Sequence, residues 1–118
     1  MNAKNAQIGD GRVNGTREYW KGLIEQYAKR YGVDPKHAVA VAQCESELRP
    51  DVYGDHGLAY GIYQFHEQTF TLFAREFKLS GLDYTDPEDS IQLAMIAFAN
   101  GKEGHWTCHA KVLKRAAI

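Results

Sequence analysis

The chain has 118 residues, of which 44% are hydrophobic and 25% are charged, and its formal net charge is -1. This length suits one domain with its own core. The balanced charge argues against a nucleic-acid partner, which would favour a basic stripe, and no run approaches the ~20 apolar residues of a membrane span.

The first fifteen residues are polar and rich in Asn and Gly. We expect residues 1–15 to form a flexible leader, followed by a single domain over 16–118. Thr16 is the expected N-cap of a helix over 17–31, and Gly32 is expected to close it. The helix is predicted from a four-residue repeat of Tyr19, Leu23, Tyr27 and Tyr31.

A second helix is predicted after Asp34, which is a suitable N-cap, with Pro35 as its first residue. Pro50 is expected to stop this helix. The following stretch, 51–65, contains three glycines and several aromatic residues. It predicts an irregular loop with a short hairpin around 53–62.

Three further helices are predicted in the second half of the chain. The first covers 67–79 and ends before Gly81, the second opens at Asp86-Pro87, and the last covers about 109–116. Their expected core residues are Phe70, Phe73, Ala74, Phe77, Ile91, Ala94, Met95 and Phe98. The expected fold class is therefore mainly α, with a Gly-rich loop or short β-hairpin after the second helix.

Two glutamates stand two positions apart in the second helix, within the segment AQCESEL. At 100° per residue, the apolar positions of this helix fall within about 60° of Glu45, whereas Glu47 falls on the opposite, polar side. A carboxylate on an apolar face is costly to ionise, so its pKa should rise. A carboxylic acid that remains protonated near neutral pH is the general acid of glycoside-cleaving enzymes. A plain ion pair between Glu45 and Arg49, four residues on, is the alternative.

The loop after this helix contains the segment GLAYGIYQF, which begins twelve residues after Glu45. Gly57 and Gly61 allow a close backbone approach. Tyr60, Tyr63 and Phe65 offer flat faces suited to sugar rings, and Gln64 offers both a donor and an acceptor. Packed aromatic residues in a Gly-rich turn are the alternative interpretation.

Glu-Ser at the end of an Ala-rich helix, followed by Gly-x-x-x-Gly-x-x-Gln, resembles the lysozyme-like lytic transglycosylases that cut bacterial peptidoglycan. A closer likeness is to the resuscitation-promoting-factor branch, which has Cys before the catalytic Glu and a late Trp-x-Cys. Cys44-Glu45-Ser46 and Trp106-Thr107-Cys108 match these features. The likeness covers about residues 33–110.

The resemblance implies a small α+β lysozyme-like fold and an enzyme that cleaves the β-1,4 bond between N-acetylmuramic acid and N-acetylglucosamine. It implies that Glu45 acts as both acid and base and that the product is a 1,6-anhydro sugar, formed without hydrolysis. It also implies a disulfide between Cys44 and Cys108. The residues expected to bind substrate are Ser46, Tyr60, Gly61, Tyr63, Gln64 and Trp106.

The sequence departs from the family pattern at two places. Glu47 stands where many relatives have Gly. Many lytic transglycosylases have a Tyr-Asn motif in a late helix, and the nearest segment here, Phe98-Ala99-Asn100-Gly101, lacks the tyrosine hydroxyl. Trp106 is interpreted either as a stacking surface for sugar or as a core residue.

Two other functions stay open. Asp51 or Asp55 could serve as a second carboxylate, which would make the protein a hydrolytic muramidase, although loop aspartates more often form turns. An inactive glycan-binding or structural wall-associated module is the alternative from another class.

We expect no cofactor and no metal site, because the five histidines lack metal-binding motifs. The expected partner is the glycan strand of peptidoglycan, and the expected state is a monomer. The N-terminus lacks the apolar segment of a signal peptide. The expected location is nevertheless extracellular, periplasmic or virion-associated.

Overall fold

A computed structural model describes the backbone of residues 3–116 and the side chains of residues 17–116. It contains five α-helices, which are α1 (Ala3–Tyr31), α2 (Pro35–Ser46), α3 (Glu67–Glu76), α4 (Pro87–Ala99) and α5 (Thr107–Ala116). Three two-residue strands lie between α2 and α3, namely β1 (Tyr53–Gly54), β2 (Ala59–Tyr60) and β3 (Phe65–His66). Short 3-10 turns cover Asp55–Gly57 and Glu103–His105.

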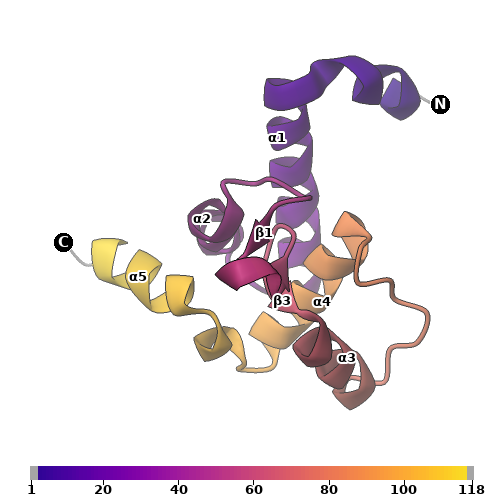
Figure 1. The fold of residues 1–118 in the computed structure, drawn as a ribbon. Coiled ribbons are helices and arrows are strands. Elements are labelled where there is room, and N and C mark those ends of the chain that lie inside the picture. Colours follow the sequence, from indigo (N-terminus) through magenta and orange to yellow (C-terminus); the bar gives the residue numbers. More distant parts are fainter. Residues whose placement is uncertain (1–2, 117–118) are drawn as a thin grey trace.

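The small sheet lies at the centre of the molecule, with α2 and α5 on one side and α3 on the other (Figure 1). Helix α1 packs against α2 and α4, and α5 packs against α2. This arrangement confirms the predicted mainly α, lysozyme-like class. Within residues 3–116, no helix is both long and apolar enough to span a membrane.

Helix α1 begins at Ala3, so the prediction that Thr16 caps it is wrong. Once a helix is nucleated, each added residue contributes one backbone hydrogen bond, and polar residues can extend it despite weak propensity. Figure 1 shows the N-terminal turns of α1 bending away from the rest. The side chains of the expected leader, residues 1–15, lie outside the described ones, and its flexibility stays a prediction. The predicted end is confirmed at Tyr31, followed by Gly32 at φ 76.

Helix α2 starts as predicted, with the Asp34 side chain accepting a hydrogen bond from the Lys36 amide. Its end differs, because the helix stops at Ser46, before Pro50 is reached. Glu47 turns left-handed at φ 57 and Leu48 follows at φ 60. The left-handed Glu47 keeps the hydrogen bond from its N–H to Gln43, which closes the last turn as a C-cap does.

The core confirms the predicted apolar face of α2, because Ala38, Val41, Ala42 and Leu48 are all buried. In α1 the fully buried residues are Ile24 and Ala28, and the predicted tyrosines lie partly exposed beside them. The predicted inward face of α4 is buried as well. Helix α2 is thus packed against α1 and α5, which holds its C-terminal turn in place.

The predicted hairpin is part of a three-stranded antiparallel sheet in the order β1-β2-β3. Tyr60 pairs with Tyr53 on one side and with Phe65 on the other. Helices α3 and α4 lie where predicted, but α3 ends at Glu76 and α5 begins earlier than expected, at Thr107. The earlier start of α5 brings its first turn to Cys108.

The left-handed conformation of Glu47 predicts a stabilising substitution. A side chain in this region is strained, whereas glycine adopts it freely. The ion pair of Glu47 with Arg49 is long, at 3.6 Å, and both side chains are more than half exposed, so its loss costs little. We expect Glu47→Gly to raise the free energy of unfolding by about 1 kcal/mol.

Chemical denaturation measures this change, and Glu18→Gly is the matched control. Glu18 is an exposed residue inside α1, where glycine should cost about 1 kcal/mol. Equal destabilisation by both substitutions would show that the Glu47 backbone carries no strain.

Candidate active site

Glu45 lies in the last turn of α2, one residue before the helix ends. Its side chain is only partly exposed, whereas that of Glu47 is 61% exposed. Arg49 pairs with Glu47 and not with Glu45, so the alternative of a Glu45–Arg49 pair is not supported. The two glutamates therefore occupy different environments, as the helix geometry predicts.

Burial raises the pKa of the Glu45 carboxyl, and this desolvation is its largest influence. Two opposing influences lower the pKa, namely a hydrogen bond from the backbone N–H of Cys108 and the charge of Lys111. The net direction is upward, so the protonated acid persists to higher pH than it would for an ordinary glutamate. Such a group can donate a proton and can take one back.

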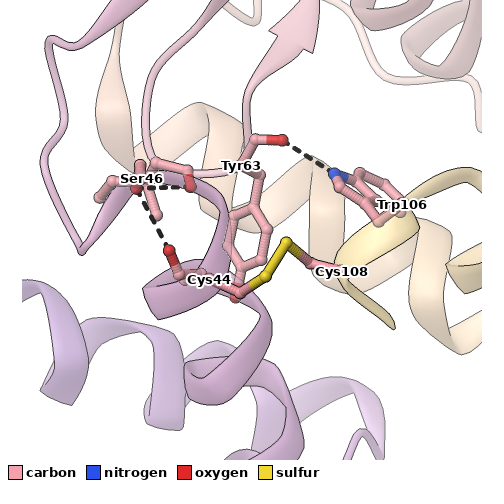
Figure 2. Close-up of a disulfide and its surroundings, with 7 residues drawn as sticks. Cys44, Ser46, Tyr63, Trp106 and Cys108 are labelled. Atoms are coloured by element: carbon pink, nitrogen blue, oxygen red, sulfur yellow. Dashed lines mark hydrogen bonds between the residues drawn. A yellow bond between two sulfur atoms is a disulfide. The ribbon is translucent and has the colours of Figure 1, made fainter. Parts of the chain in front are cut away.

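The Cys44–Cys108 disulfide joins α2 to the first turn of α5, across a sequence separation of 64 residues (Figure 2). Cys44 directly precedes Glu45, and Cys108 is the residue whose N–H reaches the Glu45 carboxyl. The pairing implied by the resemblance is therefore present, and the bond lies beside the acid.

Ser46 is 4% exposed, and its hydroxyl donates to the carbonyl of Ile62 at 2.8 Å, with the Ala42 carbonyl at 3.3 Å (Figure 2). The hydroxyl therefore ties the end of α2 to the glycine-rich loop. The expected contact of Ser46 with substrate does not fit this burial, and its role is to hold the turn that carries Glu45.

Tyr63 and Trp106 are also core residues, at 0% and 4% exposure. The Tyr63 hydroxyl donates to the Ala38 carbonyl at 2.7 Å, and Trp106 Nε1 donates to the Tyr63 carbonyl at 2.8 Å. The Trp106 ring packs against Phe98 at 5.0 Å between centroids. Neither ring has a free face for a sugar, because both faces are used in packing, so the core interpretation of Trp106 applies.

Gln64 and Gly61 shape the loop from within. Gln64 Nε2 donates to the carbonyls of Val52 at 3.0 Å and Gly61 at 2.8 Å. Gly61 has φ 89 and is buried, and its N–H donates to the Val52 carbonyl at 3.0 Å. The amide donors of Gln64 are thus already used inside the protein, and Gly61 supplies a turn that other residues rarely adopt.

Tyr60 is the one aromatic residue among those expected to bind sugar that keeps some exposure. Its ring lies 4.7 Å from that of Tyr53, which is 67% exposed, and 5.8 Å from that of Tyr84. Tyr53 and Tyr84 also line a cleft of about 960 Å³ between the sheet, α3 and residues 81–85. Glu45 does not line this cleft.

The two candidate second carboxylates have other neighbours. Asp55 pairs with His66 at 2.8 Å, and its side chain is 53% exposed. Asp51 is exposed. Burial raises the pKa of the Tyr60 hydroxyl most, and Tyr53 and Asp51 raise it further. Among the described residues, no carboxylate contributes to the pKa of Glu45.

Left-handed non-glycine residues gather just after Glu45. Glu47, Leu48, Asp55, His56 and Gln64 all have φ between 50 and 60, and outside this segment the structure describes only one more, Lys78. Strained backbone of this kind tends to gather at functional sites. Here the packing of Ser46, Tyr63 and Gln64 holds it in place.

Sequence reasoning missed the part of the site that comes from α5. The amide of Cys108 and the charge of Lys111 reach Glu45 from a helix more than 60 residues away in sequence. The Trp-x-Cys motif was the available signal, but it indicated only the disulfide. In the described part of the chain, no three His, Cys, Asp or Glu side chains gather where a metal ion could be held.

A half-buried acid at the end of a helix, followed by a glycine-rich loop and a small sheet, defines a lysozyme-like glycan-cleaving domain. A family model described as "Transglycosylase SLT domain" matches residues 22–106, which is most of the chain. The chain therefore belongs to the SLT transglycosylase family. No curated protein and no solved structure matches it.

This family consists of lytic transglycosylases that act on peptidoglycan, and the protein is an enzyme of this kind. Peptidoglycan is its substrate, which places its action outside the cytoplasm. The matched region contains α2, the sheet and Glu45, and it ends at Trp106, just before the disulfide partner Cys108.

Proposed function

We propose that Glu45 alone serves as acid and base in a non-hydrolytic cleavage of the bond between N-acetylmuramic acid and N-acetylglucosamine. One observation carries this proposal. Glu45 is a half-buried carboxyl with a raised pKa, and no other described carboxylate acts on it. A hydrolase of the two-carboxylate type would need a second carboxylate that is free to act beside the bond, whereas Asp55 is paired with His66 at 2.8 Å.

The reaction proceeds in two proton transfers. Protonated Glu45 gives its proton to the glycosidic oxygen, the bond from that oxygen to C1 of the muramic acid breaks, and the substrate's acetamido group stabilises the positive charge at C1. The Glu45 carboxylate then takes the proton of the C6 hydroxyl, whose oxygen bonds to C1 and closes a 1,6-anhydro ring. The enzyme ends protonated, as it began, and no water is consumed.

For substrate contacts, we propose that sugar lies along the partly exposed Tyr60, next to Tyr53. Their flat faces suit the apolar faces of pyranose rings. Gly61 and Gln64 then act by shaping the loop that presents Tyr60. A monomer acting outside the cell, in the periplasm or from a virion remains our proposal for the state and location of the protein.

Mass spectrometry of digested peptidoglycan tests the reaction type. We expect muropeptides one water lighter than hydrolytic products, and we expect Asp51→Asn and Asp55→Asn to leave their amount within about twofold of wild type. Full-mass reducing ends that disappear with either aspartate variant would establish a two-carboxylate muramidase instead. Glycan binding without release would establish a binding module.

A further inference from the structure

Helix α5 brings positive charge close to the Glu45 carboxyl. The disulfide holds the Cα atoms of Cys44 and Cys108 5.9 Å apart, and Glu45 is the next residue after Cys44. The first turn of α5 therefore lies against the last turn of α2. A helix N-terminus has free N–H groups and a partial positive charge, which favour a nearby carboxylate.

Lys111 lies on the same side of α5 as Cys108, because residues three apart in a helix are neighbours. Cys108 and Val112 on this side pack into the core, whereas Lys111 is exposed at its edge. Among the described groups of α5, Lys111 is the one whose positive charge lowers the pKa of Glu45.

The other charged groups near this junction are engaged elsewhere. Just after α2, Glu47 and Arg49 pair with each other on the exposed side of the turn. Between the two helices, the His37 Nε2 and His109 Nδ1 atoms lie 2.8 Å apart in a hydrogen bond. Burial first, and then His109, lower the pKa of His37, which favours its neutral form. Lys111, on the side of α5 that the disulfide turns toward the end of α2, is therefore the remaining charge of this junction that acts on Glu45.

We propose that Lys111 is a positioning residue for catalysis, which stabilises the carboxylate form of Glu45 while the amide of Cys108 fixes its orientation. This inference rests on the proposed function of Glu45. When Glu45 gives its proton to the leaving oxygen, a negative charge appears in a half-buried site. Lys111 offsets that charge at the moment it forms, which makes Glu45 a stronger acid than burial alone would allow.

Lys111→Gln tests the proposal, because it removes the charge and keeps most of the side chain. Since Lys111 lowers the pKa of Glu45, its loss should raise that pKa further. The alkaline limb of the pH–rate profile, which follows loss of the acid proton, should move to higher pH. The plateau rate should fall by about two- to five-fold, the range typical of one partly screened charge.

Two matched variants separate this role from a structural one. Lys111→Arg should restore both the position of the alkaline limb and the plateau rate. Lys114→Gln removes an equal charge from the same helix one turn further along, outside the groups that act on Glu45, and it should behave as wild type. An unchanged limb in Lys111→Gln, or an equal shift in Lys114→Gln, would overturn the proposal.

A direct titration keeps this test independent of turnover. The ¹³C shift of the Glu45 carboxyl carbon, assigned by its absence in Glu45→Gln, can be followed against pH in the full chain. Its midpoint should rise in Lys111→Gln and return in Lys111→Arg. If the midpoint moves as expected while wild type releases no glycan, the proposed function fails and the electrostatic coupling stands. If the midpoint does not move, the coupling fails whatever the activity.

Discussion

Glu45→Gln is expected to lower muropeptide release from purified peptidoglycan by about a hundred- to ten-thousand-fold, the usual contribution of a general acid–base group. Glutamine has nearly the same shape as glutamate, and its side-chain oxygen can still accept from the Cys108 amide. It has no proton to give at neutral pH. The fold should therefore persist while both proton transfers are lost.

Glu47→Gln is the matched control, because it makes the same chemical change two residues away on the exposed side of the chain. We expect its rate to stay within about twofold of wild type. Circular dichroism and thermal unfolding should show both variants folded. If Glu45→Gln retained wild-type release, or if Glu47→Gln lost as much, the assignment of Glu45 as the acid would be wrong.

Removal of the disulfide, by Cys44→Ala with Cys108→Ala, is expected to lower the free energy of unfolding by about 4 kcal/mol. The reason is the long loop that it closes, since the bond spans 64 residues and restricts the unfolded chain accordingly. Chemical denaturation measures the loss. Such a loss is a large part of the total stability of a small domain.

The same variant should also lose activity, because α5 is no longer held against Glu45. Reduced wild-type protein is the control, since it lacks the bond and keeps both sulfur atoms, and it should reproduce both losses. An oxidised wild type and a double variant with equal stability and equal release would contradict the idea that the disulfide holds α5 in place.

Much of this fold follows from local sequence signals. The Asp34-Pro35 and Asp86-Pro87 starts are predicted from capping chemistry, and both aspartates accept a hydrogen bond from the amide two residues on. Helix geometry also predicts that Glu45 is less exposed than Glu47, although Glu47 lies just beyond the helix, in a left-handed turn. Local chemistry is sufficient for the two helix starts.

The sequence-based predictions that differ from the structure do so because of tertiary packing. The end of α2 is held by the hydrogen bond from Ser46 to the Ile62 carbonyl, and no local sequence pattern predicts that contact. Tyr63 and Trp106 look like sugar platforms in sequence, but their hydrogen bonds and packing place them in the core. The role of α5 depends on a contact across the disulfide, so its charge could not be assigned to Glu45 from spacing.

The two departures from the family pattern also have structural meaning. Glu47 occupies a left-handed position, at φ 57, where glycine is the residue best suited. Phe98, in the segment nearest to the expected tyrosine motif, is 5% exposed and packs on Trp106. Glu47 therefore has a strained backbone, whereas Phe98 contributes to the core.

The most direct test of a single-carboxylate, non-hydrolytic reaction is digestion of purified peptidoglycan in water enriched in oxygen-18. The digest is reduced at once with borohydride, and a hydrolytic muramidase is run in parallel as the reference for label uptake. We predict wild-type products that are one water lighter than the reference products, that carry no oxygen-18 and that are absent with Glu45→Gln. Reducing ends that carry oxygen-18 at the level of the reference would contradict this account, because water and not the C6 hydroxyl would then have attacked the sugar.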